Sequence, residues 1–248
     1  MLARAEGGTF TARRVVELLF KASQLEPADL NGLVAEGLDL AGLDFKGARI
    51  AGADLFGADL TGANLAAVDL AGARLDRATI TRAEFSTANL ERATILTPNV
   101  FTTLEPDKRE APRFAGAKLA GARLSGRLDR SDFRWADLTG ARFGSVDERG
   151  NAPPALRAGL TGANFSEARL AGTHLAGSTL EYAKFVGADL TGANLRGANL
   201  TQANFTGADL AGADLTDADL YEAVLTGARG LDRAIGLATV KNADTIIR

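Results

Sequence analysis

The sequence predicts an all-β solenoid, and the prediction depends mainly on a period of five residues. Between Leu30 and Ile95, and again between Leu160 and Leu225, nearly every fifth residue is Leu, Phe or Ile, and the residue two places earlier is usually Ala. A period of five matches neither the 3.6 residues of a helical turn nor the two-residue alternation of a long strand. The chain must therefore turn every five residues, with the small residue and the Leu or Phe pointing inward.

The spacing of the phenylalanines predicts how many five-residue sides make one coil. Phe165, Phe185 and Phe205 are 20 residues apart, and Phe45 and Phe85 are 40 apart. Large rings in a narrow core are expected to recur once per coil, so each coil has four sides. Neighbouring coils then stack through parallel backbone ladders.

The repeated triplet Ala-(Asp/Asn)-Leu resembles the pentapeptide-repeat family, most clearly from Ala188-Asp189-Leu190 to Ala218-Asp219-Leu220. The resemblance implies a right-handed, four-sided parallel β-helix over residues 28–230. It covers about 35 repeat units, four fifths of the chain, which corresponds to about nine coils. At about 4.8 Å per coil, the rod is expected to be about 40 Å long.

Both ends of the solenoid are expected to be capped, because open end coils expose unpaired strands. Residues 1–27 form the expected N-terminal helical cap, with an apolar stripe through Val15, Leu18 and Leu19. Residues 231–248 form the expected C-terminal cap, with a short helix over 231–238 and a last strand over 245–247. Proteins that the chain resembles often pair through their C-terminal ends, so this segment is also a candidate homodimer contact.

The repeat is interrupted twice, at residues 96–113 and 144–159, where Pro and charged residues replace the pattern. These segments are predicted to be loops that project from the solenoid wall. Each is either a partner-recognition element or a tolerated insertion; Phe101 and Leu104 favour recognition for the first. Between Leu124 and Leu128 the spacing is four, so one residue is missing or a corner is tightened.

The residue types required for catalysis are scarce. The chain has no cysteine, and its one histidine, His174, is expected on the outer surface. Neither a metal or cofactor site nor an enzyme is therefore expected. The sequence shows no signal-peptide pattern and no apolar run of about 18 residues, so we expect a cytoplasmic protein without a membrane partner.

Charge and aromatic residues indicate where a partner could bind. Residues 160–228 hold eight acidic and three basic side chains, whereas residues 96–159 hold eight acidic and eleven basic ones. An exposed tryptophan lies among the basic residues. The candidate partner-binding residues are Phe101, Leu104, Arg127, Arg130, Arg134, Trp135, Asp209, Asp214, Asp217 and Asp219.

Two functions remain open. The first is a non-catalytic binding protein, and its specific form is implied by the resemblance: some pentapeptide-repeat proteins protect DNA gyrase or a related topoisomerase such as topoisomerase IV by imitating duplex DNA. The formal net charge of −3 is far below the roughly 20 charges of a duplex of this length, so only a partial mimic is expected. Direct nucleic-acid binding is not expected. The alternative is a structural scaffold or accessory module, such as those associated with bacterial secretion systems.

Overall fold

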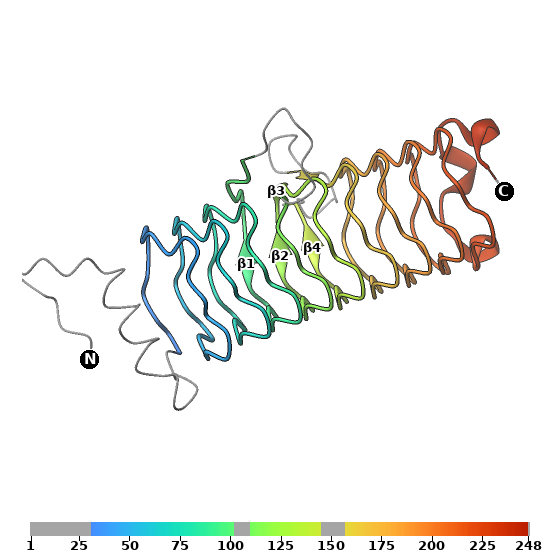
Figure 1. The fold of residues 1–248 in the computed structure, drawn as a ribbon. Helices are drawn as coiled ribbons and strands as arrows, with labels where there is room; N and C mark the ends of the chain where they lie inside the picture. The colour runs from blue at the N-terminus through green and yellow to red at the C-terminus, as the bar shows by residue number, and fades with distance from the viewer. Residues whose placement is uncertain (1–30, 102–109, 145–156, 248) are drawn as a thin grey trace, which may run out of the picture.

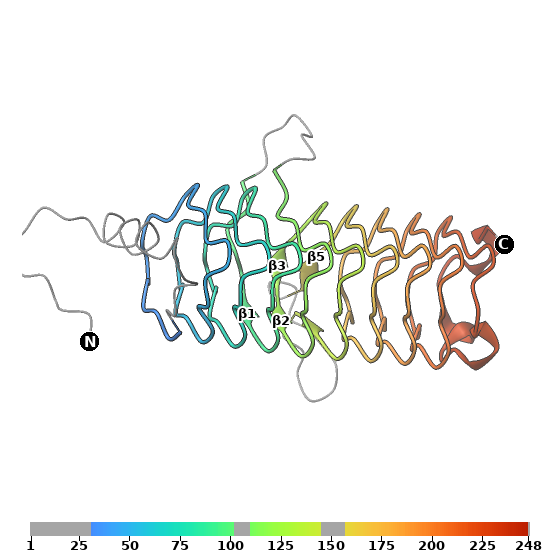
Figure 2. The same cartoon turned by 60° about the horizontal axis from the view of Figure 1, so that its bottom comes forward.

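The protein is an elongated solenoid in which every coil lies directly on the one before it (Figure 1). The structure, a computed structural model, describes residues 31–101, 110–144 and 157–247. The helical cap expected over residues 1–27 lies outside these ranges. Figure 2 shows the same stack from a second side, with the described C-terminal residues at the far end of the rod.

Parallel backbone pairing joins the coils, which confirms the all-β solenoid. One bridge residue per side pairs with its equivalent 20 residues later, as in Asp54 with Arg74 and Asn194 with Asp214. Where pairing extends over two residues, short strands are formed: β1 (Thr94–Ile95), β2 (Arg123–Leu124), β3 (Gly126–Arg127), β4 (Arg142–Phe143) and β5 (Ala158–Gly159). β1, β2 and β4 form one parallel sheet, and β3 pairs with β5.

The core consists of the small residue and the large central residue of each repeat, as predicted. Ala53 and Leu55, for example, are completely buried. A continuous column of stacked rings runs through Phe85, Phe114, Phe133, Phe165, Phe185 and Phe205, with centroids 4.9–5.1 Å apart and planes within 8° of parallel. Each stacked pair contributes about 0.5–1.5 kcal/mol beyond its burial.

The ring column shows that both interruptions are insertions into an unbroken core. Phe85 and Phe114 are 29 residues apart and Phe133 and Phe165 are 32 apart, yet both pairs stack as neighbours. The interruptions are shorter than the sequence predicts. Asn99 still pairs with Thr79, and Arg82 donates to the Glu110 carbonyl, so the coil runs to Phe101 and resumes at Glu110. Likewise, β5 belongs to the coil rather than to the second insertion.

The four-residue spacing between Leu124 and Leu128 is absorbed at Gly126. In β3, Gly126 pairs with Ala158, the small inward residue of the next coil, so the corner before it has one residue fewer. A Cβ on Gly126 would lie 2.9 Å from the Thr97 Cα, and its φ is +80°. Ser125 stabilises the shortened corner because its hydroxyl accepts a hydrogen bond from the Thr97 amide at 3.2 Å.

The C-terminal segment is a final coil with longer sides, not the helix and strand expected from the sequence. Three 3-10 turns form its corners: η3 (Leu231–Arg233), η4 (Leu237–Thr239) and η5 (Ala243–Thr245). Each follows a residue in the left-handed region, namely Gly230, Gly236 and Asn242. Ile235, Lys241 and Ile247 pair with the preceding coil at a spacing of six residues. The sixth residue per side leaves room for a 3-10 turn in place of the usual corner.

Candidate functional site

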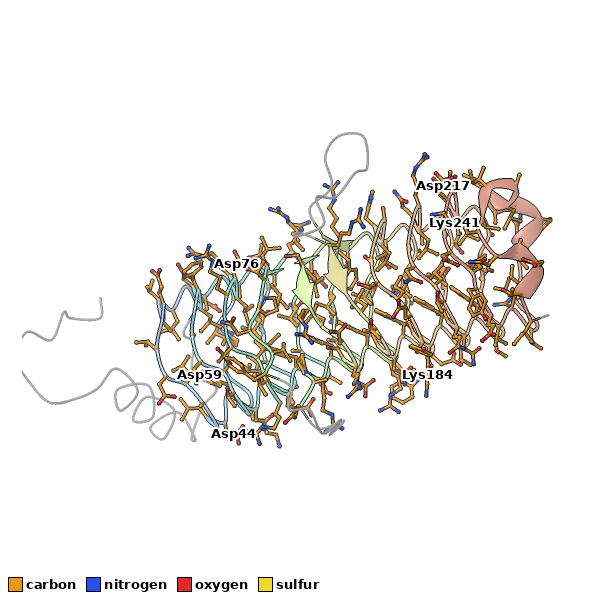
Figure 3. All side chains as sticks on the ribbon, turned by 90° about the horizontal axis from the view of Figure 1, so that it is seen from above. Asp44, Asp59, Asp76, Lys184, Asp217 and Lys241 are labelled. Carbon is orange, nitrogen blue, oxygen red and sulfur yellow. The ribbon has the colours of Figure 1, made fainter. Side chains whose placement is uncertain are left out.

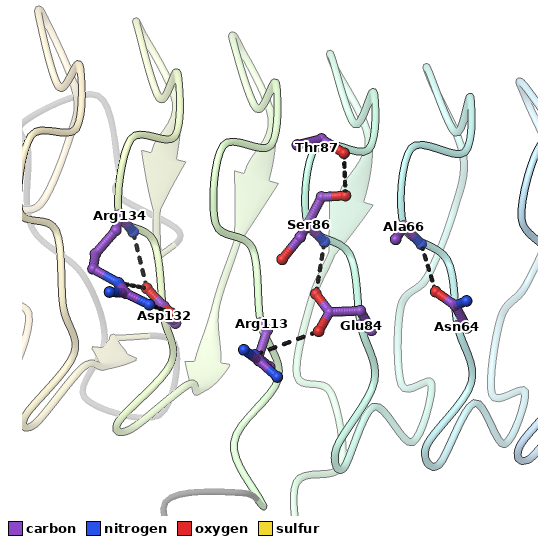
Figure 4. A network of polar contacts seen from close by, with 8 residues as sticks. All are labelled: Asn64, Ala66, Glu84, Ser86, Thr87, Arg113, Asp132 and Arg134. Atoms are coloured by element: carbon purple, nitrogen blue, oxygen red, sulfur yellow. Dashed lines mark hydrogen bonds and ion pairs between the residues drawn. The ribbon is translucent and has the colours of Figure 1, made fainter.

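One side of the solenoid, here named the groove face, carries a bridge ladder of mixed charge through the central coils. Its successive members are Glu84, Arg113, Asp132, Asn164 and Lys184. Figure 4 shows the ladder from Asn64 to Asp132, one residue per coil. An open groove of about 830 Å³ runs along this face, and its lining also includes Arg82, Ala111, Pro112, Arg130, Arg134, Gly162 and Tyr182.

The local fold explains why these residues converge. Arg82, Arg130 and Tyr182 occupy the same corner of different coils, each with φ of 58° or 59°, so their side chains stand along one edge of the groove. In the coil between those of Arg130 and Tyr182, the same corner is occupied by Gly162. Because Gly162 has no side chain, it leaves space for the Arg130 stem. Ala111 and Pro112, which follow the first insertion, complete the wall.

The carboxylate and amide oxygens in the groove are already engaged. Glu84 accepts the Ser86 amide at 3.0 Å and forms an ion pair with Arg113 at 3.4 Å (Figure 4). Asp132 accepts two side-chain hydrogen bonds from Arg134, at 2.9 and 2.7 Å. The Asn164 side-chain oxygen accepts the backbone amide and hydroxyl of Ser166.

Burial alone would raise the pKa of Asp132, but the hydrogen bonds and positive charge of Arg134, together with Arg113, lower it below its ordinary value. The Asp132 carboxylate is therefore charged at neutral pH and neutralises Arg134. The Arg134 guanidinium also lies 4.9 Å from the centroid of the Trp135 ring. Arg134 is thus held in place by two neighbours.

Three cations in the groove remain without an acidic partner among the described residues. The ion pairs of those residues do not include Arg82, Arg130 or Lys184, and all three side chains are exposed. The Asn164 amide nitrogen likewise forms no hydrogen bond within the described part of the chain. The groove therefore offers free donors and a net positive charge, which suits an anionic ligand.

Comparison with known families decides the identity of the fold. The model for pentapeptide repeats matches eight copies, at residues 23–62, 58–95, 113–144, 158–197 and 193–229. The chain belongs to the pentapeptide-repeat family. Comparison with curated proteins finds no match.

Solved structures similar to this pentapeptide-repeat protein come from different biological settings. HetL, involved in heterocyst differentiation regulation in Nostoc, is 25% identical with a TM-score of 0.42, covering 96% of this chain and 100% of HetL. QnrB1, a plasmid-mediated fluoroquinolone resistance protein, is 19% identical with a TM-score of 0.38, covering 87% and 89%. A thylakoid-lumen protein of Arabidopsis thaliana is 28% identical with a TM-score of 0.30, covering 58% and 78%.

The basic residues predicted from the sequence lie on two faces of this pentapeptide-repeat protein. Arg130 and Arg134 line the groove, and Trp135, with 58% of its surface exposed, stands at the next corner. Arg127 lies instead in β3 on the neighbouring side, where it pairs with Asp129 at 3.4 Å. Sequence proximity placed Arg127 with the others, but a corner separates it from them. The sequence reasoning missed Arg82 and Lys184, because the insertions and the missing residue change their spacing from Arg130 and Asp132 and only the stacking register aligns them.

The predicted acidic residues do not form one surface. Asp209, Asp214 and Asp219 belong to ladders on three different sides, because a step of five residues passes a corner. The Asp217 carboxylate pairs with Arg196 at 3.6 Å. Figure 3 shows Asp217 and Lys184 on opposite edges of the rod.

Of the remaining predicted residues, Phe101 is 67% exposed at the start of the first insertion, and Leu104 lies outside the described residues. His174 is half-buried and pairs with Arg142 and Asn194 in the backbone ladder. No group of three or more His, Cys, Asp or Glu side chains within the described ranges could hold a metal ion. Those ranges also contain no helix long and apolar enough to span a bilayer.

Proposed function

We propose that this pentapeptide-repeat protein is a non-catalytic binding protein that engages a protein partner through its groove face. One observation carries the proposal: the groove's carboxylate and amide oxygens are engaged internally, whereas Arg82, Arg130 and Lys184 are left without an acidic partner among the described residues. Unpaired, exposed cations around a groove contribute little to folding, but they favour association with a complementary surface.

DNA gyrase is the first specific partner to test, because some members of the family protect this topoisomerase. A cytoplasmic location is part of the same proposal. The distribution of acids argues against duplex imitation as the mechanism, since Asp209, Asp214 and Asp219 lie on different sides of the rod. Contact would instead come from the groove and from the first insertion, whose return at Ala111 and Pro112 forms a groove wall.

The test is DNA supercoiling by purified gyrase, with and without a fluoroquinolone, in the presence of the full chain. A variant lacking residues 102–110 returns Phe85 and Phe114 to a spacing of 20 residues, so the core is expected to remain continuous. A second variant lacking residues 145–156 restores the same spacing between Phe133 and Phe165, and the flanking residues Gly144 and Arg157 do not line the groove.

We expect the full chain and the second variant to alter supercoiling or protect gyrase, and the variant lacking 102–110 to lose this effect. No effect of the full chain at micromolar concentrations overturns the choice of gyrase. Equal activity of all three proteins overturns a role for the groove side.

A scaffold is the second candidate, and the unbroken Phe column favours it, since it makes the rod continuous across both insertions. A spacer depends on its length and not on its groove. The scaffold would be supported if the assembly that contains the protein failed when one complete 20-residue coil was removed but still worked when either insertion was deleted.

A further inference from the structure

The three free cations of the groove are regularly spaced along the rod. Arg82 belongs to the coil of Phe85, Arg130 to that of Phe133 and Lys184 to that of Phe185. One coil separates Arg82 from Arg130, and one separates Arg130 from Lys184, and the rings of successive coils are 4.9–5.1 Å apart. The cations therefore recur about every 10 Å over a length of about 20 Å, as two strand spacings require.

This spacing fits an extended polypeptide. A polyproline II chain rises about 3.1 Å per residue and has three residues per turn, so positions i, i+3 and i+6 lie on one side at intervals of about 9 Å. Three acidic residues at that spacing would each reach one cation. The Asn164 amide group lies between Asp132 and Lys184 along the ladder, in the coil between those of Arg130 and Lys184, and provides a donor for a backbone carbonyl.

The groove edge adds apolar contact that a peptide can use. Tyr182 is 55% exposed at the same corner as Arg130, and the buried residues Ala111 and Pro112 line the groove beneath the exposed side chains. A nucleic-acid strand fits less well, because its charges recur about every 3.4 Å along the axis and the whole chain carries a formal net charge of −3.

We propose that the groove binds an extended acidic segment of a partner protein, which lies parallel to the rod axis with carboxylates on Arg82, Arg130 and Lys184. The inference rests on the proposed function of the groove face and names the chemistry of its partner. Arg113 and Arg134 remain paired with Glu84 and Asp132 and shape the groove without supplying free charge.

The test is fluorescence anisotropy with labelled peptides and the full chain. The probe is a Pro-rich peptide with Glu at every third position; the comparison peptides carry Gln at those positions, or the same Glu residues in adjacent positions. We expect the spaced Glu peptide to bind at least about tenfold more tightly than either comparison, and to weaken as salt rises.

The chain offers a matched control variant. Arg130→Gln removes the central cation, whereas Arg92→Gln alters an exposed arginine at the equivalent corner position, with φ of 57° against 59°, on another edge of the rod. We expect Arg130→Gln to weaken peptide binding about tenfold and Arg92→Gln to leave it unchanged. Thermal melts of both variants check that the fold is retained.

Absence of binding, equal binding of all three peptides, or equal losses in both variants would overturn the inference. Tighter binding of a single-stranded oligonucleotide than of the spaced Glu peptide would also overturn it. Peptide binding without any gyrase effect would remove only the gyrase candidate. A gyrase effect that survives Arg130→Gln, with no peptide binding, would remove this inference and leave the proposed function intact.

Discussion

In many repeats the middle residue is an Asp or Asn that closes the next corner with its own side chain. The Asp209 Oδ1 atom accepts the Ala211 amide at 3.0 Å, and Asp219 accepts the Tyr221 amide in the same way. This Asx-type turn satisfies a backbone donor where the chain changes direction. The many acidic residues at this position in the C-terminal coils therefore have a role in folding. Their abundance does not by itself indicate that this protein binds a partner through an anionic surface.

This role predicts that position 209 needs an acceptor but not a charge. Asp209→Ala is expected to lower the free energy of unfolding by about 1 kcal/mol, because the Ala211 amide loses its partner. Asp209→Asn keeps the acceptor and is expected to cost less than about 0.5 kcal/mol. Urea denaturation of the two variants measures the difference; equal losses would contradict the assignment.

His174 allows a prediction about pH. Burial lowers the pKa of His174 below its ordinary value of 6.5, and the adjacent Arg142 lowers it further. As pH falls below 6.5 the unfolded state takes up the proton first, so stability decreases until the folded pKa is passed. Because His174 is the only histidine, its ring protons can be followed by NMR.

The imidazole is expected to titrate with a midpoint below 6.5, and Arg142→Gln is expected to move that midpoint upward. Arg92→Gln is the control and should leave it in place, because Arg92 lies beside Thr94, three steps from His174 along the same ladder. A midpoint at or above 6.5 in the unmodified protein would show that the imidazole is not desolvated.

At the scale of the coil, the sequence predicted the regular sides but not the irregular ones. The period of five identified the inward Ala and Leu residues because the core repeats them. Phe114 and Phe133 could be aligned with Phe85 only in the structure, since the insertion and the missing residue change their spacing to 29 and 19. The six-residue sides of the last coil were missed because too few of them occur to establish a period.

The shortened corner between Leu124 and Leu128 predicts an unusual requirement for glycine at position 126. Gly126→Ala would bring a Cβ to 2.9 Å from the Thr97 backbone, whereas Gly140, with φ of +64°, has nothing within 4 Å of such a Cβ. Gly126→Ala is expected to lower stability by about 2 kcal/mol more than Gly140→Ala, because only the first adds a clash to the left-handed backbone cost. Equal denaturant midpoints for Gly126→Ala and Gly140→Ala would contradict this explanation of the four-residue spacing.

At the scale of the whole molecule, surface residues must be sorted by side before they can be interpreted. Sequence order brings Arg127 close to Arg130 and Asp214 close to Asp219, but the corners place the members of each pair on different sides. Residues 20 apart, or equivalent across an insertion, share a side. Only the stacking register, which the insertions shift, assembles Arg82, Arg130 and Lys184 into one groove.

The final coil ends the described rod with exposed apolar side chains, which keeps a C-terminal homodimer as a prediction. Ile235, Leu237 and Ile247 are 56%, 38% and 51% exposed. Pairing of two such ends would bury these residues and cover the last open coil, and both effects favour association.

Sedimentation of the full chain is expected to show a dimer. The double variant Ile235→Glu, Leu237→Glu is expected to be a monomer with an unchanged far-UV spectrum. Replacing Ala120 and Ala171, which lie on the solenoid wall in earlier coils, with Glu should leave the dimer intact. A monomeric full chain at tens of micromolar would contradict the dimer prediction. The 3-10 turns would then serve only to cap the rod, and each molecule would present a single groove.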